Sequence, residues 1–420
     1  MSRSWTLVLC VCALALGWVL STAASTSRGG LDAGVAAFVE KIRAAEVQVR
    51  ESPSFGSDAE QAGGYVHLAR AIIRALEEGV LQDPDYPYFR ILDFWLREGG
   101  DNPDQRYAFS PLRGGEAYRI WGDLGSARRI EFQLYAGEPW AGTGRSVGYL
   151  AFEDMAVDDD GTFVVNLSKQ RNAGDANWLE NPAAATTVFV RHIYDDWNEE
   201  VPGHVHIDRV GYEGRRRPPD TRDALAARFF AAAEMLEKSA TRWPDFVAQR
   251  YVGPGPANRM LPLVDTYALG GAKGRWMSGG HFDLPPGQAL LIETWPTSAQ
   301  YQGVQLTDMW FASLEHANQV SSLTTRQSRA SANGAYHYVV SREDPGSANW
   351  LDTGGLARGV FLLRYDGVRG EIPEAQRPSA ELVELASLAE RIPGFTRVSE
   401  SEREGVRSAR RRHLQLRSGR

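Results

Sequence analysis

Two stretches of this sequence repeat one another about 172 residues apart, and this repeat constrains the fold more than any other feature of the chain. Asn177-Trp178-Leu179-Glu180 corresponds to Asn349-Trp350-Leu351-Asp352, and an apolar run begins about eleven residues after each asparagine. An Asp-Gly pair at 160–161 and an Asn-Gly pair at 333–334 precede the two segments, at an offset of 173 rather than 172. We therefore expect a duplicated β unit.

Both copies consist of short runs of β-branched and aromatic residues that are separated by Gly, Asp and Asn, a pattern typical of strands and tight turns. The runs are 118–121, 130–135, 163–166, 187–193 and 205–210 in the first copy, and the pattern resumes from about 261 to 366. Because Asp-Gly and Asn-Gly favour hairpins, we expect antiparallel pairing. The predicted fold class is α+β, mainly antiparallel β, with two related β-sandwich or jelly-roll-like units.

Helical patterns come before, between and after the two β units. Apolar stripes with helical spacing run through 31–49 and 65–76, a third short segment covers 88–96, and a further helix is expected at 221–243. The expected divisions are an N-terminal helical region at 25–100, a first β unit at 101–213, a helical connector at 214–260, a second β unit at 261–370 and a C-terminal helix within 371–396, at about 379–391.

The last segment, 397–420, is strongly basic and contains eight arginines against three glutamates. Because it lacks an apolar stripe, we predict a disordered, solvated tail, with contact to an anionic surface as the alternative. The whole chain has a formal net charge of −7, which disfavours nucleic acid as a partner.

The first 24 residues have the features of a secretory signal peptide. Arg3 precedes an apolar run at 5–20, and small residues follow it. This predicts an exported protein, periplasmic or secreted. An uncleaved anchor is the alternative, although the run is shorter than the ~20 residues that span a membrane. Cys10 and Cys12, the only two cysteines, lie in this leader, so the mature protein would have neither disulfides nor thiolate metal sites.

The second half contains a further group of motif residues, of which 344–354 is the most specific part. They are Gly280, Phe282, Asp283, Leu284, Glu293, Tyr301, Gln305, Leu306, Trp310, Ser313 and the run 344–354. This half resembles the family called domain of unknown function 1214. Residues 102–104, 118–122 and 196–199 resemble the N-terminal region of such proteins, whose relatives also carry a half called domain of unknown function 1254.

The resemblance covers about 85–367 and implies an exported bacterial protein with a β-sandwich or jelly-roll fold. It implies no established reaction. The sequence departs from the family pattern at Gln302 and Gly303, which follow Tyr301 where we expect an aromatic residue.

No catalytic motif is complete. Residues 144–148 fit G-x-S-x-G, but a strand pattern follows the serine where that motif needs a helix. The candidates for a carboxylate hydrolase are Asp344, Asp352, Glu293 and Arg326. The candidates for ligand contact are Trp310, Trp350, Tyr301 and Asn349, since aromatic faces can stack on sugar rings or line an apolar pocket. Because the Asn-Trp-Leu-acid element occurs in both halves, a structural corner is the favoured explanation for it.

His204, His206 and Asp208 alternate along one predicted strand, so their side chains share one face and could form a metal site. We favour an ordinary surface strand, because no neighbouring carboxylate has the spacing of a cupin metal motif, and we expect neither a metal nor another cofactor.

Three functional hypotheses follow. The favoured one is an exported β-sandwich protein that binds a carbohydrate or a hydrophobic small molecule. The second is a hydrolase that uses the carboxylates of the second β unit. The third is a structural module that assembles into a homo-oligomer.

Overall fold

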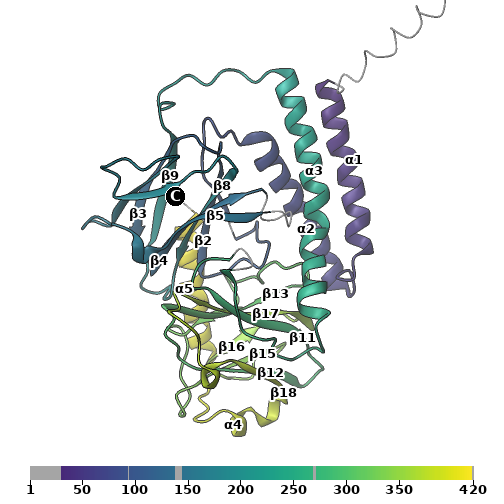
Figure 1. The fold of residues 1–420 in the computed structure, drawn as a ribbon. Helices are drawn as coiled ribbons and strands as arrows, with labels where there is room; N and C mark the ends of the chain where they lie inside the picture. The colour runs from purple at the N-terminus through teal and green to yellow at the C-terminus, as the bar shows by residue number, and fades with distance from the viewer. Residues whose placement is uncertain (1–29, 93, 138–143, 268–270, 419–420) are drawn as a thin grey trace, which may run out of the picture.

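The computed structural model describes residues 30–92, 94–137, 144–267 and 271–418. They form two β units, a group of three helices against one side of them, and a C-terminal helix between them (Figure 1). The signal peptide predicted at 1–24 lies outside the described residues. No helix in the described ranges has the length and apolarity that a membrane span needs.

The first β unit is a sandwich of a five-stranded and a four-stranded sheet. The larger sheet has the order β1 (Arg90–Leu92), β2 (Gln105–Pro111), β8 (Ala185–Ile193), β4 (Arg129–Ala136) and β5 (Arg145–Leu150). The smaller sheet has the order β7 (Asn177–Glu180), β6 (Thr162–Ser168), β3 (Tyr118–Gly125) and β9 (Pro202–Arg209). Apolar side chains that alternate along the strands fill the space between the sheets, among them Phe132, Phe163 and Val190.

The second β unit repeats this architecture strand by strand. Its larger sheet has the order β10 (Val264–Asp265), β11 (Trp276–Asp283), β17 (Arg358–Asp366), β13 (Tyr301–Thr307) and β14 (Ser322–Thr324). Its smaller sheet has the order β16 (Trp350–Asp352), β15 (Tyr336–Ser341), β12 (Gln288–Thr294) and β18 (Ser379–Glu384). Each strand therefore corresponds to the strand nine places earlier, with the same neighbours. The predicted fold class, with two related β units, is confirmed.

The repeated Asn-Trp segments form strands that pair in parallel, β7 with β6 and β16 with β15, in sheets that are otherwise antiparallel. The expectation of antiparallel pairing is therefore wrong for these two strand pairs. In the first copy, Asn177 donates to the carbonyl oxygen of Val164 at 2.9 Å, beside the start of β6. This bond holds the start of β7 beside the start of β6, and the two strands run in the same direction.

Three helices pack against the two units. Residues Phe38 of α1 (Leu31–Glu51), Leu68 of α2 (Asp58–Leu76) and Leu236 of α3 (Arg222–Val247) belong to one apolar cluster. Helix α3 connects the two β units, and Val247 at its end packs into the second one.

Two segments that were expected to be helical contain strands instead. In 88–96, β1 pairs with the edge of β2, and in 379–391, β18 pairs with β12 before the short helix α4 (Leu388–Arg391). Short apolar runs do not distinguish a helix from a strand, and here a free sheet edge decides the outcome. Leu388 and Ile392 then cover the outer face of β12 and β15.

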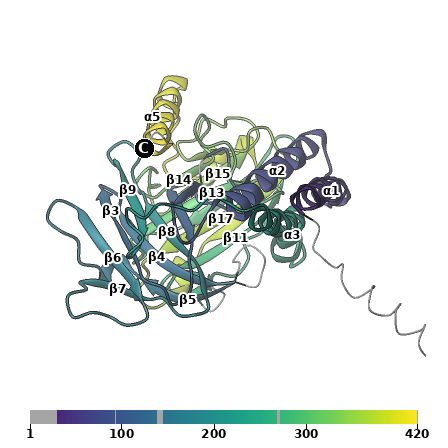
Figure 2. The ribbon, with the colours of Figure 1, turned by 90° about the horizontal axis from the view of Figure 1, so that it is seen from above.

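The segment 397–420 is not a disordered tail: its described part forms the helix α5 (Glu400–Ser418). Ser399 and Glu402 exchange side-chain and backbone hydrogen bonds at its start, as in a capping box. Arg403, Arg410 and Arg417 repeat every seven residues on one face and are buried. Arg403 pairs with Asp344, Arg410 and Arg417 donate to backbone carbonyl groups, and all three lie over aromatic rings, so the helix docks without an apolar stripe. Figure 2 shows α5 away from the three-helix group.

Candidate functional site

The outer faces of the two five-stranded sheets face one another across a layer of polar side chains. Gln105 of β2 donates to Asp366 of β17 at 3.1 Å. Arg275, just before β11, bonds Asp366 at 2.9 Å and lies 3.3 Å from Glu131 of β4. Although burial alone would favour the neutral acid, the Arg275 guanidinium holds the pKa of Asp366 below its ordinary value. The two β units are thus joined by ion pairs where their sheets meet.

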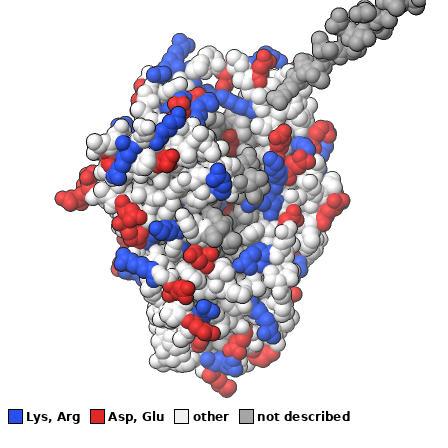
Figure 3. Space-filling model, viewed as in Figure 1, with Lys and Arg blue, Asp and Glu red and all other residues white. Residues whose placement is uncertain are grey.

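A cavity of about 600 Å³ opens at one end of this layer, between the two sheets and the end of α3. Figure 3 shows a hollow near the middle of this face of the molecule, with Lys and Arg side chains near its edges. The walls of the cavity are largely aromatic, and the rings include Tyr107, Phe189, Trp243, Phe246, Tyr251 and Phe311. A large cavity with apolar walls and a few charged groups is the usual form of a small-molecule site.

Two of the arginines in the wall occupy equivalent positions in the two units. Arg191 of β8 donates to Gln133 of β4 at 2.9 Å, and Arg364 of β17 donates to Gln305 of β13, also at 2.9 Å. The two arginines, like the two glutamines, are separated by the repeat distance of about 172 residues. Arg191 also contacts the hydroxyl of Tyr135 at 3.3 Å, and Arg364 donates to the carbonyl oxygen of Gly100.

The other titratable groups in the wall are shifted by burial. Burial raises the pKa of the Tyr107 hydroxyl, although Arg364, Arg275 and Arg191 each act to lower it. Burial likewise raises the pKa of Tyr251 to about 12. Both tyrosines are therefore neutral near pH 7, and the positive charge of the cavity comes from its arginines.

Phe311 enters the cavity wall from a strained turn. Its φ is 62°, a left-handed conformation that bulky residues rarely adopt. Asp308 holds the turn, because one of its carboxylate oxygens accepts from the backbone N–H groups of Trp310 and Ala312, both at 3.0 Å. Gly100 donates to the carbonyl oxygen of Phe311 at 2.7 Å. The turn rotates Phe311, rather than its neighbour, toward the cavity.

Trp310 and Tyr301, two of the residues proposed to touch a ligand, do not line this cavity. Trp310 is 1% exposed, stacks on His67 and donates to the carbonyl oxygen of Glu60 at 2.8 Å. Tyr301 donates to Asp104 at 2.7 Å, where the two β units meet. The departure at Gly303 has a steric reason, since a Cβ there would lie 2.4 Å from the Tyr301 hydroxyl.

Asn349 and Trp350, the other two ligand candidates, form a corner that also exists in the first unit. Asn349 accepts from the N–H of Arg329 at 2.8 Å and donates to the carbonyl oxygens of Arg329 and His337. Asn177 makes the same three bonds, to the N–H and carbonyl of Ala156 and to a strand carbonyl. Trp350 is buried beneath Arg403. This geometry is that of a structural corner.

The four hydrolase candidates have separate partners and none lines the cavity. Asp344 pairs with Arg403 of α5 at 2.7 Å, and Glu293 pairs with His337 at 3.0 Å. Asp352 accepts from the N–H of Gly354 at 2.8 Å, and burial raises its pKa. Arg326 lies 3.9 Å from Asp195 and 3.8 Å from Glu199 of the first unit. No described contact joins these four side chains into one catalytic group.

The strand β9 presents His204, His206 and Asp208 on one face, but each interacts with β3. His204 lies 2.9 Å from Asp123, His206 stacks on Trp121, and Asp208 accepts from the indole of Trp121 at 2.8 Å. Within the described ranges, no three His, Cys, Asp or Glu side chains are arranged to hold a metal ion.

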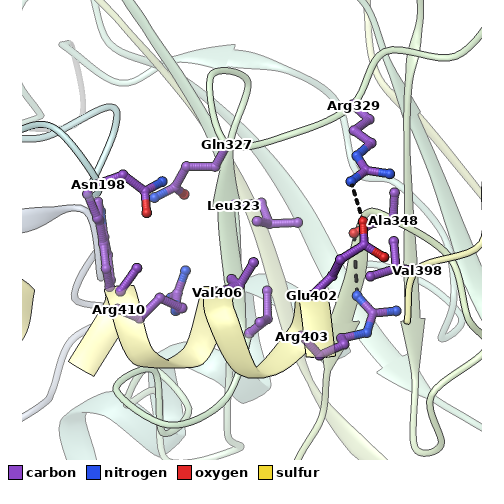
Figure 4. A pocket seen from close by; sticks show the side chains of 13 residues that line it. Asn198, Leu323, Gln327, Arg329, Ala348, Val398, Glu402, Arg403, Val406 and Arg410 are labelled. Carbon is purple, nitrogen blue, oxygen red and sulfur yellow. Dashed lines mark hydrogen bonds and ion pairs between the residues drawn. The ribbon is translucent and has the colours of Figure 1, made fainter. Parts of the chain in front are cut away.

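A second cavity, of about 160 Å³, lies beside α5 (Figure 4). Its charged side chains already have partners. Arg329 bonds Glu402 at 3.1 Å, Arg403 bonds Asp344, and Arg410 donates to the carbonyl oxygens of His316 and Ser322. This cavity is smaller, and Arg410 is its one buried arginine without an ion pair among the described residues, whereas the cavity between the sheets has two. The cavity between the sheets is therefore the stronger candidate.

Comparison with known proteins supports the fold. No family model matches the chain, and no curated protein matches it. Among solved structures it is similar to an uncharacterised protein from Burkholderia cenocepacia, with a TM-score of 0.77 and 26% identity over 85% of this chain and 98% of that one. A protein from Vibrio parahaemolyticus aligns with a TM-score of 0.44 and 11% identity, over 76% of this chain and 98% of that one. The descriptions of these two proteins name no function.

One feature of the sequence, which the motif search did not use, does point to this site. Gln133 and Gln305, and Arg191 and Arg364, are polar residues kept at the repeat distance within strands that are otherwise mainly apolar. By contrast, nothing in the local sequence separates Phe311 from Trp310.

Proposed function

We propose that this protein is an exported binding protein for a small organic acid with an apolar body, and that the cavity between its two β units is the binding site. The observation that supports this most is the pair of buried arginines, Arg191 and Arg364, in a wall made largely of aromatic rings. Burying a cation is costly unless an anion accompanies it, and the rings offer an apolar molecule an environment free of water.

This proposal selects among the earlier hypotheses. A carbohydrate needs many hydrogen-bond acceptors, whereas the acidic residues in the wall are Glu98, which pairs with Arg74, and Asp101, which accepts from Ser313. A carboxylate hydrolase needs its acidic groups close together, whereas Asp344, Glu293 and Asp352 each interact with a different partner. Assembly into a homo-oligomer stays a prediction, as does export, for which the support is the leader sequence.

Calorimetric titration and thermal unfolding of the purified protein test the proposal with matched acid and amide pairs, 2-naphthoate with 2-naphthamide and decanoate with decanamide. We expect at least one acid to bind one equivalent and raise the melting temperature, and its amide to bind at least tenfold more weakly. Equal effects of acids and amides, or no effect of any acid, would contradict the proposal.

A pair of variants tests the location. Val264→Trp places a large side chain in the cavity wall at the short edge strand β10, and should abolish binding. Val164→Trp adds the same side chain on the exposed face of β6, where Val164 is 44% exposed, and should leave binding intact. If the acid binds both variants equally well, the binding site does not lie in this cavity.

A further inference from the structure

The cavity is lined by equivalent residues from both β units, and we infer that its ligand is a dicarboxylate, with one carboxylate bound by Arg191 and the other by Arg364. This inference rests on the proposed function and narrows its substrate class. The ligand's apolar spacer would lie among the aromatic rings that line the same cavity, including Phe189 and Phe311.

The first step of the argument is the equivalence of the two arginines. Arg191 lies opposite Tyr107 in the pairing of β8 with β2, and Arg364 lies opposite Met277 in the pairing of β17 with β11. Those strands are counterparts, each nine places apart in chain order. Because each arginine also bonds the counterpart glutamine of the next strand, the two units present the same guanidinium-amide pair to one shared space.

The second step concerns charge. The residue surfaces of Arg191 and Arg364 are 7% and 8% exposed, and within the described ranges neither forms an ion pair with a carboxylate. Arg275, equally buried in the same wall, differs in that Asp366 and Glu131 compensate it. The cavity thus contains two buried cations whose direct hydrogen-bond partners are neutral, although Arg364 also acts on Asp366 electrostatically. A ligand with two carboxylates would give each arginine an ion pair.

The third step concerns hydrogen-bonding capacity. A guanidinium has five N–H donors and matches a carboxylate in a two-pronged arrangement. Arg191 gives bonds to Gln133 and Tyr135, and Arg364 gives bonds to Gln305 and Gly100. These neutral contacts hold each guanidinium in place while donors remain for a ligand. Each arginine is therefore positioned before the ligand arrives, which lowers the entropic cost of binding.

Calorimetric titration with a dicarboxylate and its monomethyl ester tests the inference, with terephthalate and sebacate as the probes. We expect at least one of the two dicarboxylates to bind at least tenfold more tightly than its ester. If the esters bind equally well, the dicarboxylate inference fails while the proposed function stands. If neither the diacids nor the monoacids bind, the proposed function itself fails.

Variants assign each carboxylate to its arginine. Arg191→Gln and Arg364→Gln should each remove the discrimination between diacid and monoester, and Arg191→Lys should restore part of it. Arg250→Gln, which changes the cavity wall on the α3 side, should weaken both probes by a similar factor. Circular dichroism and urea unfolding establish that each variant is folded. Discrimination that survives in both folded glutamine variants would overturn the inference.

Discussion

Asp344 and Arg403 form a two-pronged ion pair, with nitrogen–oxygen distances of 2.7 and 2.8 Å, that ties α5 to the second β unit. The carboxylate that seemed a catalytic candidate therefore holds the C-terminal helix in place. The Arg403 side chain is buried and also donates to the carbonyl oxygen of Ser347, so the contact combines charge with backbone recognition.

Replacement of Arg403 by alanine should lower the free energy of unfolding by about 2–4 kcal/mol, because it breaks a largely buried pair and leaves a carbonyl group unsatisfied. Arg407→Ala, which removes the half-buried partner of the exposed Glu400, should cost less than about 1 kcal/mol. Urea unfolding of the two variants measures both values. A loss for Arg403→Ala no larger than for Arg407→Ala would mean that α5 does not depend on this contact.

The paired asparagine corners predict equal costs in the two units. Asn177→Ala and Asn349→Ala each remove three hydrogen bonds to backbone groups, and each should destabilise the protein by about 2–3 kcal/mol. Neither should change the affinity for an organic acid. Unfolding curves and calorimetry on the same samples check both statements, and a selective loss of binding in Asn349→Ala would return that residue to the ligand site.

Replacement of Glu200 by glutamine should raise the free energy of unfolding in a pH-dependent way. Burial raises its pKa to about 7, although backbone N–H groups of Asp196 and Asp195 oppose the rise. The folded state therefore retains this proton up to a higher pH than the unfolded state, and ionisation becomes destabilising as the pH rises from about 4.5 through 7. Glutamine can still accept the two backbone bonds, of 2.6 and 2.7 Å.

Glu200→Gln should thus match the wild type near pH 4 and exceed its free energy of unfolding by about 1 kcal/mol above pH 7, a value that allows for the partial exposure of the group. Urea unfolding from pH 4 to pH 8.5 gives the difference curve. Glu199→Gln, at a side chain that is 74% exposed, supplies a flat control. A constant offset for Glu200→Gln at every pH would show that the charge is not the cause.

Arg275 forms ion pairs with one acidic residue of each β unit, Glu131 of the first and Asp366 of the second. Arg275→Met leaves Asp366 and Glu131 buried without their shared partner, and should cost about 3–5 kcal/mol. Arg275→Lys should recover only part of this loss, since one ammonium group cannot reproduce the two-pronged contact with Asp366 while also reaching Glu131. Denaturation of the three proteins at pH 7 gives the order, and full recovery by lysine would contradict the geometric argument.

The repeat predicted the fold class because duplication leaves a pattern at one fixed distance, as in Asn177 and Asn349. It could not predict α5. Arg403, Arg410 and Arg417 are buried through bonds to carbonyl groups and through stacking on rings such as Trp197, and neither kind of contact leaves an apolar period in the sequence. A basic helix of this kind has the composition of a solvated tail.

The candidate site was harder to predict, because its walls come from strands of both units, the end of α3 and the turn at Phe311. Trp310 and Phe311 are adjacent, and which ring faces the cavity is determined by the turn that Asp308 holds and by the bond from Gly100 to the Phe311 carbonyl oxygen. Comparison of polar positions between the two halves of the repeat would have pointed to Arg191 and Arg364.

The strand-for-strand duplication has a consequence for how such a protein can evolve. In a symmetric pair of identical chains, each mutation in the shared cavity would appear twice. Here α3 joins both halves in one chain, so each half can diverge alone. The outer face of the second small sheet has become apolar under Leu388 and Ile392, while its counterpart keeps an exposed Trp121. Because the two halves are joined in one chain, selection can change each wall of the cavity separately. Each wall can then fit a different end of an asymmetric molecule.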